Sequence, residues 1–528
     1  MIVRATILCL LAMTGATNSV AQNPSSVNAT QPRNSKHEWR YYNGDLGGTK
    51  YSDLEQINTG NVQDLELVWQ FRVPDFVEGK NTTLQFNPLM VNGVLYLATV
   101  GQKIIAVKPD TADPIWTFDP YQGSGATGKT RAILYWENGD SRRIFYGVAN
   151  GYYCLDADTG ELVESFADGG RLDLTKNLDH DGITRRYDTR GPGVIYEDLL
   201  ILGGSVGEGP GQANPGHIRA FDVRTGERQW IFHTVPHPGE FGYESWSPES
   251  YKYVGGANAW GGITLDPDRG MVFMGTGSAT YDHWGGNRVG DNLFANCVLA
   301  LDAKTGERLW HFQTVHHDLW DYDLPTAPTL IKLLKDGKEI DAVAQPSKMG
   351  HLFVLDRETG EPIFGVEERP VERSEIPGEY TAPTQPFPLK PAAYTDQHYT
   401  LDDVTDLNPY ARAYALEQLK DFKLGPIFTP PGFQKLVMLP QFNGGSEWPG
   451  AAFDTTENTL YINSSNEAEW ISMREAKIED EIALPALGEQ IYQAVCSNCH
   501  NFNGAGSLNG VEFPALRSVK DRLSREEV

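Results

Sequence analysis

Apolar and polar positions alternate in short runs along the chain, and each run ends in a similar turn. Five segments share an alternating apolar run, a turn built on Asp with Thr-Gly or a close variant, and then an aromatic residue; they read IIAVKPDTADPIWTF, YYCLDADTGELVESF, RAFDVRTGERQWIF, LALDAKTGERLWHF and FVLDRETGEPIF. Alternation is typical of a half-buried strand, and Asp with Thr-Gly favours a tight turn. Each segment predicts a β-hairpin, and GGITLDPDRGMVFMGTG and GAAFDTTENTLYINSS predict looser copies.

The regular return of these hairpins indicates a β-propeller, in which each unit buries its face against a neighbour. One long stretch interrupts the pattern. Residues 367–433 are rich in proline, and we expect them to form a long excursion over the surface. Within them, NPYARAYALEQLKDF predicts a short helix with Asn408 as its N-cap and Pro409 at its first position.

The pattern changes from strand to helix after Trp470, which marks a second domain. An amphipathic stretch leads into Cys496, Cys499 and His500, which form C-x-x-C-H, the motif that attaches a c-type haem through two thioethers and a histidine ligand. We therefore expect residues 480–528 to begin a small α-helical cytochrome c domain. No methionine follows His500, so we expect the sequence to end inside that domain, before a second haem ligand.

The first 22 residues, MIVRATILCLLAMTGATNSVAQ, predict a signal peptide. Arg4 provides the positive start, an apolar stretch follows, and Ser19-Val20-Ala21 is a small-residue cleavage site. No later run is long and apolar enough to suggest a transmembrane segment. We expect export to the periplasm, and a propeller domain over residues 23–475.

Composition narrows the possible partners. The 528 residues carry a formal charge of −26 at pH 7, which argues against binding to nucleic acid or to anionic membranes. Two of the five cysteines, Cys154 and Cys297, fall inside predicted strands. They could pair, but we expect buried free thiols because the chain shows no disulfide-stapled pattern.

Several motifs resemble one enzyme family. WHFQTVHHDLWDYDLPTAPTL, AVAQPSKMGHLFVLDRETG, GHIRAFDVRTGERQWIFHTVPHPGEFGYESW and NGGSEWPGAAFD are similar to segments of quinoprotein dehydrogenases of the membrane glucose dehydrogenase branch, over roughly residues 39–470. The resemblance implies an all-β, eight-bladed propeller that binds pyrroloquinoline quinone (PQQ). The family's last blade segments are not recognisable in this sequence, so we expect the propeller to be incomplete in this chain.

The resemblance implies that Asp321 is the catalytic base and also touches the metal. Oxidation of an alcohol needs a base for the hydroxyl proton, and a carboxylate can serve. Asp318 and Asp323 are nearby competitors, and a lone Asp in a loop is often only a turn former. Lys348 matches the family's residue that hydrogen-bonds the quinone oxygens, where a fixed positive charge stabilises the negative charge of reduction. The alternative for Lys348 is an ordinary surface lysine.

Glu208 matches an acidic ligand of Ca²⁺ or Mg²⁺ in the family, and such ions prefer oxygen donors. A turn carboxylate is the alternative. Ser278 stands where related alcohol dehydrogenases place another ligand, Asn, so we expect other donors, with Glu447 a candidate. His316 and His317 are adjacent and would point in different directions in a strand, which argues against a shared metal and favours a place in the active-site wall.

The remaining predicted cofactor contacts come from the same resemblance. Trp260 matches the tryptophan on which the flat cofactor stacks, although a structural tryptophan is the alternative. Arg131 matches a partner of a cofactor carboxylate, a group that suits the planar guanidinium. Gln85 and Trp448 are further candidates for contact with the cofactor.

We therefore predict a periplasmic quinohaemoprotein dehydrogenase that oxidises a sugar, polyol or other alcohol. Electrons would pass from PQQ to haem c and then to a cytochrome or ubiquinone. Two alternatives come from other classes: a non-catalytic propeller scaffold for envelope assembly, and a simple electron carrier. A scaffold would hold neither PQQ nor metal, and a carrier would hold only haem.

Overall fold

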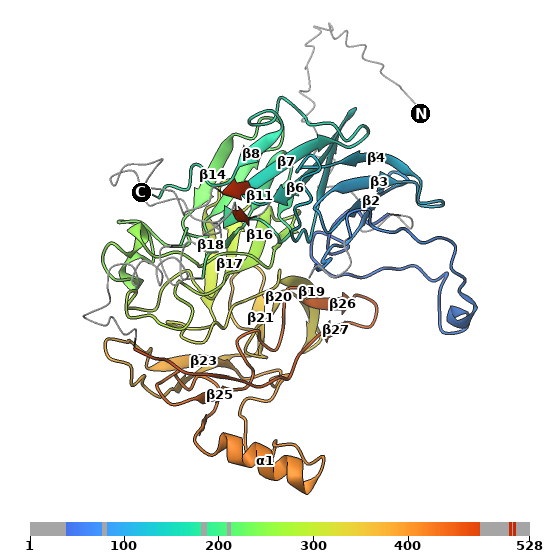
Figure 1. Ribbon diagram of the computed structural model, residues 1–528. Helices are drawn as coiled ribbons and strands as arrows, with labels where there is room; N and C mark the ends of the chain where they lie inside the picture. The colour runs from blue at the N-terminus through green and yellow to red at the C-terminus, as the bar shows by residue number, and fades with distance from the viewer. Residues whose placement is uncertain are drawn as a thin grey trace, which may run out of the picture.

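The computed structural model describes residues 38–76, 82–180, 187–208 and 213–475, and the backbone of residues 506–508 and 511–513. Four antiparallel four-stranded sheets follow one another in chain order, with neighbouring strands of each sheet also adjacent or nearly adjacent in sequence. Figure 1 shows these sheets side by side, from the blue strands near the N-terminus to the yellow-green strands of the fourth sheet. This arrangement confirms the predicted repeat as a propeller-like series of sheets, and five of the seven predicted hairpins form. In YYCLDADTGELVESF and FVLDRETGEPIF the turn is followed only by single bridges, Leu155 with Leu162 and Leu355 with Pro362.

The strands of the four sheets have the following bounds. They are β1 (Leu89–Val91), β2 (Val94–Ala98), β3 (Ile104–Val107) and β4 (Pro114–Phe118); β5 (Leu134–Asn138), β6 (Ser141–Val148), β7 (Gly151–Asp156) and β8 (Arg171–Asp173); β10 (Val194–Tyr196), β11 (Leu199–Leu202), β13 (Ile218–Asp222) and β14 (Arg228–Phe232); and β15 (Ile263–Asp266), β16 (Met271–Gly275), β17 (Cys297–Asp302) and β18 (Arg308–Gln313).

The remaining described elements are smaller. They are the three-stranded sheet β19 (Thr329–Lys335), β20 (Lys338–Pro346) and β21 (Leu352–Asp356); the pairs β9 (Tyr187–Asp188) with β12 (Ser205–Val206), β22 (Val366–Pro370) with β23 (Thr384–Pro388), β26 (Ala451–Asp454) with β27 (Thr459–Ile462) and β29 (Gly506–Leu508) with β30 (Val511–Phe513); the sheet of β24 (Lys423–Leu424), β25 (Leu436–Met438) and β28 (Glu469–Ile471); the helix α1 (Pro409–Leu419); and the 3₁₀ turns Val62–Asp64, Tyr243–Ser245 and Ser250–Lys252. The predicted number of eight blades stays a prediction.

The hydrophobic core lies between successive sheets rather than within any one of them. One cluster joins strands β1–β3 to β5–β7, a second joins the β5–β8 sheet to the β10–β14 sheet, and a third joins that sheet to β15–β17. A fourth joins β16–β18 to β20, β21 and β25. No sheet can therefore bury its apolar faces alone, which is the physical reason for the repeat.

The predicted Asp and Thr-Gly turns form as expected, and the turn after β17 shows how. The carboxylate of Asp302 accepts hydrogen bonds from the backbone N–H of Lys304 and Thr305 and from the Thr305 hydroxyl, at 2.8–3.0 Å. Gly306 then adopts a left-handed φ of +75°, a conformation that glycine tolerates best. The turns after Asp156 and Asp356 repeat these contacts.

A tryptophan of one sheet rests on the turn glycine of the next sheet. A Cβ atom added to Gly160, Gly306 or Gly360 would lie 2.5 Å from the indole of Trp116, Trp230 or Trp310, respectively. The three indole N–H groups donate to backbone carbonyls of the same turns, at 3.0–3.2 Å. In the three motifs that carry a tryptophan, this residue is therefore the contact that fixes one sheet against the next.

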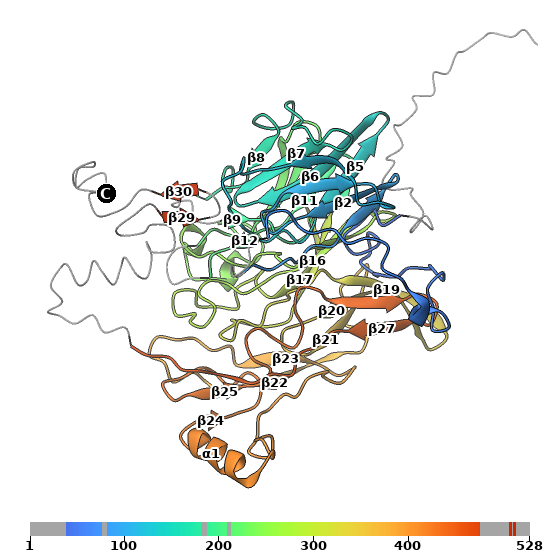
Figure 2. The same cartoon turned by 45° about the vertical axis from the view of Figure 1, so that its right-hand side comes forward.

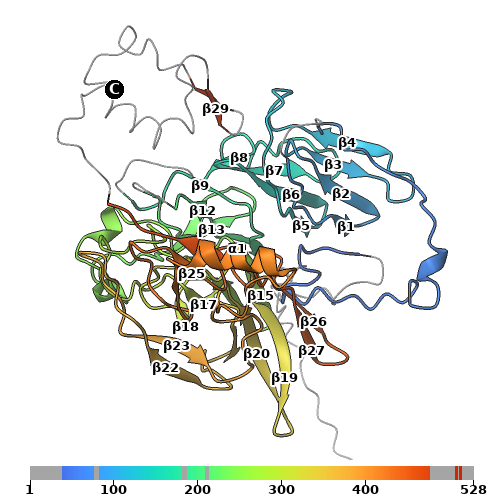
Figure 3. The same cartoon turned by 60° about the horizontal axis from the view of Figure 1, so that its bottom comes forward.

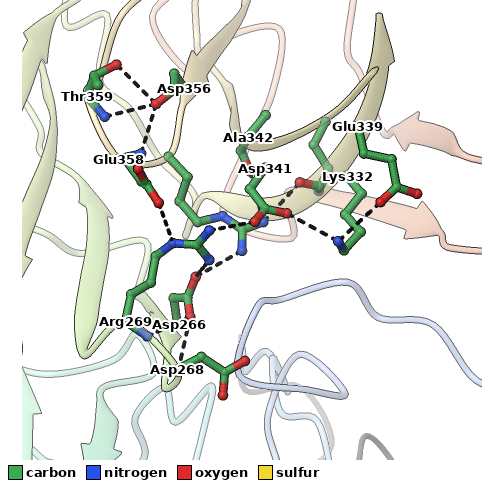
Figure 4. A network of polar contacts seen from close by, with 12 residues as sticks. Asp266, Asp268, Arg269, Lys332, Glu339, Asp341, Ala342, Asp356, Glu358 and Thr359 are labelled. Atoms are coloured by element: carbon green, nitrogen blue, oxygen red, sulfur yellow. Dashed lines mark hydrogen bonds and ion pairs between the residues drawn. The ribbon is translucent and has the colours of Figure 1, made fainter. Parts of the chain in front are cut away.

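A network of ion pairs joins the β15–β18 sheet to the β19–β21 sheet (Figure 4). The carboxylate of Asp266 accepts from Arg269 at 2.8 Å and from Arg357 at 3.0 Å. Arg269 also contacts Asp341 at 2.7 Å. Burial would raise the pKa of Asp266, but its bonds to Arg357 and Arg269 hold that pKa below its ordinary value.

The proline-rich region is more ordered than a surface excursion. Its first part forms the hairpin β22–β23, and Gln385 of β23 is fully buried. Proline fits in this hairpin because a two-stranded edge leaves N–H groups unused. The predicted helix is confirmed as α1, which Figures 1 and 2 show projecting below the sheets. The side chain of Asn408 caps it by accepting from the N–H of Ala411 at 2.8 Å.

Cys154 and Cys297 are both buried and free, as predicted. Burial raises the pKa of the Cys154 thiol to about 12.

In Figure 3 the hairpin β26–β27 lies beside β19, in agreement with their contacts. Within the described residues, no helix has the length and apolarity needed to cross a membrane. The predicted signal peptide and the haem residues Cys496, Cys499 and His500 lie outside the described residues.

We predict that Gly306→Ala destabilises the protein more than Gly337→Ala. Both glycines have a φ of +75°, but a Cβ atom at Gly337 would meet nothing within 4 Å, whereas one at Gly306 would meet Trp230. The left-handed backbone alone should cost about 1 kcal/mol in each variant, and overpacking should add about 1–3 kcal/mol in Gly306→Ala. Thermal unfolding of the two variants measures the difference, and equal midpoints would refute the role of the tryptophan contact.

Candidate active site

Loops from several sheets converge on a cavity of about 410 Å³ lined mainly by polar side chains. Arg131, Trp260 and Glu447 each lie three or four residues before the first strand of a unit, namely β5, β15 and β26. Asp321 follows β18, and Lys348 lies in the turn between β20 and β21. Residues far apart in sequence therefore meet because the repeat brings equivalent loop positions to the same place.

Lys348 stands between two carboxylates on the cavity wall. Its ammonium nitrogen lies 2.9 Å from Asp321 Oδ2 and 3.1 Å from Asp323 Oδ2, and its side chain is only 6% exposed. Burial favours a neutral lysine, but the two carboxylates raise the pKa of Lys348 above its ordinary value. Burial raises the pKa of Asp321 well above its usual range, while Lys348 opposes that shift.

The three candidate aspartates of the DLWDYD segment have different surroundings. Asp318 is buried and binds the backbone N–H groups of Trp320 and Tyr322, at 2.8 and 2.7 Å. Asp323 accepts from the Ser278 N–H at 2.6 Å, from the Trp260 indole at 3.0 Å and from Lys348. Asp321 is hydrogen-bonded through one oxygen only, to Lys348. Among the three, Asp321 has the carboxylate most available to a substrate.

Asp321 also has an unusual backbone. Its φ of +59° is left-handed, a region that residues other than glycine seldom adopt and that is enriched at functional sites. The bonds that Asp318 makes to Trp320 and Tyr322, on either side of Asp321, hold the loop in this shape. The Ser278 hydroxyl completes the support by donating to Asp318 and Asp323.

Arg131 lies between two indoles at another part of the site. Its guanidinium carbon is 5.4 Å from the ring centre of Trp260 and 4.7 Å from that of Trp448. Its Nε donates to Gln85 Oε1 at 3.0 Å. Gln85 and Trp448 therefore position Arg131, whereas Arg131 and Trp260 line the cavity.

More carboxylates than cationic side chains line the cavity. The carboxylates are Glu208, Asp282, Asp321, Asp323 and Glu447, and the cations are Lys129, Arg131, Arg190 and Lys348. Asp282, which the sequence reasoning missed, shows the effect most clearly. Burial, Asp323 and Glu208 together raise its pKa well above the ordinary value, and Lys348 only partly opposes this shift.

Comparison with known proteins explains this collection of groups. The sequence model of the PQQ family, described as "Glucose/ethanol/alcohol dehydrogenase, beta-propeller domain", matches residues 39–498. The chain belongs to this family. The match includes every cavity residue named above and extends into the predicted haem segment.

Individual relatives agree with the family. The chain is 30% identical over 485 residues to the quinate/shikimate dehydrogenase (quinone) of Acinetobacter baylyi, covering 87% of this chain and 60% of the relative. It is 31% identical over 458 residues to the quinoprotein glucose dehydrogenase of Gluconobacter oxydans, covering 81% of this chain and 55% of the relative.

The fold agrees as well. The quinohemoprotein alcohol dehydrogenase of Comamonas testosteroni superposes with a TM-score of 0.60 at 23% identity, over 83% of this chain and 59% of the other. This chain spans 55–61% of the length of the first curated relatives it matches.

The lining residues fit the family's cofactor. PQQ is a flat tricarboxylate, and the cavity offers the cationic side chains of Lys129, Arg131, Arg190 and Lys348 together with the indole of Trp260. An indole face suits a flat ring system, and guanidinium suits carboxylates. The acids of the cavity and the three carboxylates of PQQ would together give an excess of negative charge. Carboxylate oxygens are the donors that Ca²⁺ and Mg²⁺ prefer.

The sequence-predicted residues meet at this cavity. Asp321, Lys348, Arg131, Trp260, Glu208 and Glu447 line it, and Gln85 and Trp448 support Arg131 from behind. The sequence reasoning did not find Asp282, His283, Arg190 or Lys129. The available signal is the motif DHWGG after β16, whose two titratable residues Asp282 and His283 both line the cavity.

The adjacent histidines do not line the cavity. His316 lies 2.7 Å from Gln313 Oε1 and 3.2 Å from Glu368, whereas His317 bonds the Gly290 carbonyl at 2.7 Å. They face different partners, and neither forms part of the expected active-site wall. Their role is to anchor the loop that precedes Asp321.

A second group of histidines, His217, His233 and His237, brings ligand nitrogens within 4.8 Å of one another. The rings of His233 and His237 are stacked, with centres 4.0 Å apart and planes inclined by 12°. A metal ion lies in the plane of the imidazole that binds it, so one ion cannot serve two stacked rings. His217 Nδ1 also accepts from the Thr234 N–H at 3.1 Å, which leaves the ring proton on Nε2. This group packs the loop after β14.

We predict that Lys348→Met lowers the free energy of unfolding by about 3 kcal/mol, because it leaves two buried carboxylates without their cation. The double variant Lys348→Met/Asp321→Asn should regain part of this loss. Lys332→Met is the control: Lys332 is 59% exposed and lies 3.5–3.6 Å from Glu339 and Asp341. Loss of these two exposed ion pairs should change the free energy of unfolding by less than about 1 kcal/mol.

Thermal or denaturant unfolding compares the variants. A double variant no more stable than Lys348→Met would contradict an electrostatic role for Lys348.

Proposed function

We propose that this chain, with PQQ and a divalent metal bound, oxidises an alcohol group of a sugar, polyol or other polyhydroxylated compound. The observation that carries the proposal is the buried arrangement of Asp321, Lys348 and Asp323 on the wall of a cavity that Trp260 and Arg131 also line. A propeller that served only as a scaffold has no need of a buried lysine held between two carboxylates. Family membership supplies the cofactor.

PQQ, when bound, supplies the two-electron acceptor that removes hydride from the alcohol carbon. Asp321 accepts the hydroxyl proton through the carboxylate oxygen that makes no hydrogen bond to Lys348, and burial makes this carboxylate a stronger base than in water. Lys348 places a permanent positive charge beside the reacting groups and stabilises negative charge that grows there. Arg131 and Trp260 hold the cofactor's carboxylate and ring face.

Polar groups on the cavity favour a substrate with several hydroxyls. His283, Asn258, Asn443 and Thr280 line the cavity beside the charged residues. They offer donors and acceptors that a simple alkyl alcohol would leave unpaired, at a cost in binding free energy. The names of the relatives, which include glucose, quinate/shikimate and glycerol dehydrogenases, agree with this class.

We further propose that the protein is exported to the periplasm and that a haem c, attached at Cys496 and Cys499 with His500 as iron ligand, receives the electrons. The supporting features are the N-terminal signal sequence and the C-x-x-C-H motif. A haem accepts one electron at a time, so it suits transfer to a cytochrome or to ubiquinone.

Reconstitution tests the enzyme. The purified full chain, supplied with PQQ and Ca²⁺, should reduce an artificial electron acceptor when given glucose, quinate or glycerol. Asp321→Asn should lower the turnover number by about 10²–10⁴-fold while PQQ still binds. Glu361→Gln, which removes the same charge from an exposed sheet turn, is the matched control and should keep full activity.

Failure of the wild-type chain to bind PQQ, judged by absorbance after gel filtration with Ca²⁺, would overturn the proposal and favour a scaffold. Binding of PQQ with full activity in Asp321→Asn would instead remove Asp321 from the reaction.

A separate measurement tests the haem. Protein produced in the periplasm of a host that matures c-type cytochromes should carry haem that resists acidic acetone and adds one haem to the intact mass. Cys496→Ala/Cys499→Ala should lose that covalent haem but still bind PQQ. A wild-type chain without covalent haem under these conditions would refute the haem proposal and leave the PQQ proposal intact.

A further inference from the structure

Two carboxylates of the active-site cavity have no partner. In the described part of the chain, the side chains of Glu208 and Asp282 take part in no hydrogen bond and no ion pair, although both line the cavity. Glu208 is exposed to the cavity and Asp282 is half-buried. Two like charges on one wall, with no cation or donor bonded to either, favour a cation that binds there.

The two carboxylates come from neighbouring loops that are tied together. Glu208 follows β12, and Asp282 follows β16 after a short loop. The Thr280 hydroxyl, two residues before Asp282, donates to the carbonyl of Gly207 at 3.4 Å. The charges of Glu208, Asp323 and Asp321 act on Asp282, and all four carboxylates line the same cavity.

The other acids of the cavity are already engaged. Asp323 accepts hydrogen bonds from Ser278, Trp260 and Lys348, and Asp321 pairs with Lys348. Glu447 accepts a hydrogen bond from the backbone N–H of Trp448 at 3.1 Å. Burial raises the pKa of Glu447, and the positive charges of Lys348 and Arg131 oppose that rise. These three carboxylates therefore each accept a hydrogen bond or form an ion pair. Within the described residues Glu208 and Asp282 do neither, and Lys348 acts on Asp282 only through its charge.

We infer that Asp282 binds the divalent metal together with Glu208. This inference rests on the proposed function, and it places the metal on the wall formed by the Gly207–Glu208 and Thr280–Asp282 loops rather than beside Glu447. Oxygen donors from two carboxylates suit Ca²⁺ or Mg²⁺. It also accounts for Ser278, whose hydroxyl is used to hold Asp318 and Asp323 and is not needed as a metal donor.

Calcium binding tests the inference directly. The full chain, freed of metal with a chelator, is titrated with Ca²⁺ in a calorimeter, first alone and then with PQQ present. Asp282→Asn should raise the dissociation constant for Ca²⁺ at least about tenfold, as loss of a ligand or its support does at other metal sites. Saturating Ca²⁺ should restore PQQ binding to this variant.

Glu447→Gln is the matched control, because it removes one charge from the same cavity on the side of Arg131 and Lys348. Its Ca²⁺ affinity should change much less than that of Asp282→Asn. An equal loss in both variants would show a general effect of cavity charge and would overturn the assignment of Asp282 as a ligand. An unchanged affinity in Asp282→Asn would overturn it as well.

Two further results separate this inference from the proposed function. If the wild-type chain binds PQQ but its Ca²⁺ affinity does not depend on Asp282, only the inference fails. If the wild-type chain binds neither PQQ nor Ca²⁺, the proposed function fails with it. Should Asp282→Asn unfold, judged by its thermal midpoint, Asp282→Glu and Asp282→Ser replace it: the inference requires tighter Ca²⁺ binding by the glutamate variant.

Discussion

The contact between an indole of one sheet and the turn glycine of the next is the constraint on which the rest of this structure depends. Apolar faces alone would let neighbouring sheets slide, because dispersion contacts have little directional preference. Trp116, Trp230 and Trp310 remove that freedom, since each ring has a flat glycine surface beneath it and a carbonyl that accepts its N–H. The angle between the two sheets of each of these three pairs is thereby fixed. The same contacts fix the direction in which the loops of these sheets point.

The active site is the consequence of that geometry, and it is built against the preferences of a stable protein. More acids than bases line one cavity, Asp321 has a left-handed backbone, and Lys348 is buried. Such features are destabilising unless the surroundings hold them. Asp318 and Ser278 take no part in the proposed reaction. They hold the loop that carries Asp321 through five hydrogen bonds. Stability supplied by the sheets is used to keep these charges together.

Much of this could be predicted because the relevant signals are local. The Asp and Thr-Gly turn is a property of five or six consecutive residues, so its hairpins and their aromatic ends were visible in the sequence, as was the cap of α1. Resemblance to a family identified Asp321, Lys348, Arg131, Trp260 and Glu208, and the structure brings them to one cavity. The prediction failed where pairing is long-range: the partner of β22 is a strand more than a dozen residues away, and prolines hid it.

Asp282 was missed for a related reason, and it shows what a sequence motif leaves out. Alone, an aspartate in a loop is an ordinary solvated group, and only its neighbours decide otherwise. Here the neighbours are Glu208, brought from the preceding sheet, and the carboxylates after β18, brought from the same sheet through a different loop. Because Ser278 is committed to Asp318 and Asp323, the oxygen donors for a cation must come from side chains that are still free. On this proposal, the cation keeps its place although Ser278 does not bind it, because the fold puts another carboxylate on the same wall.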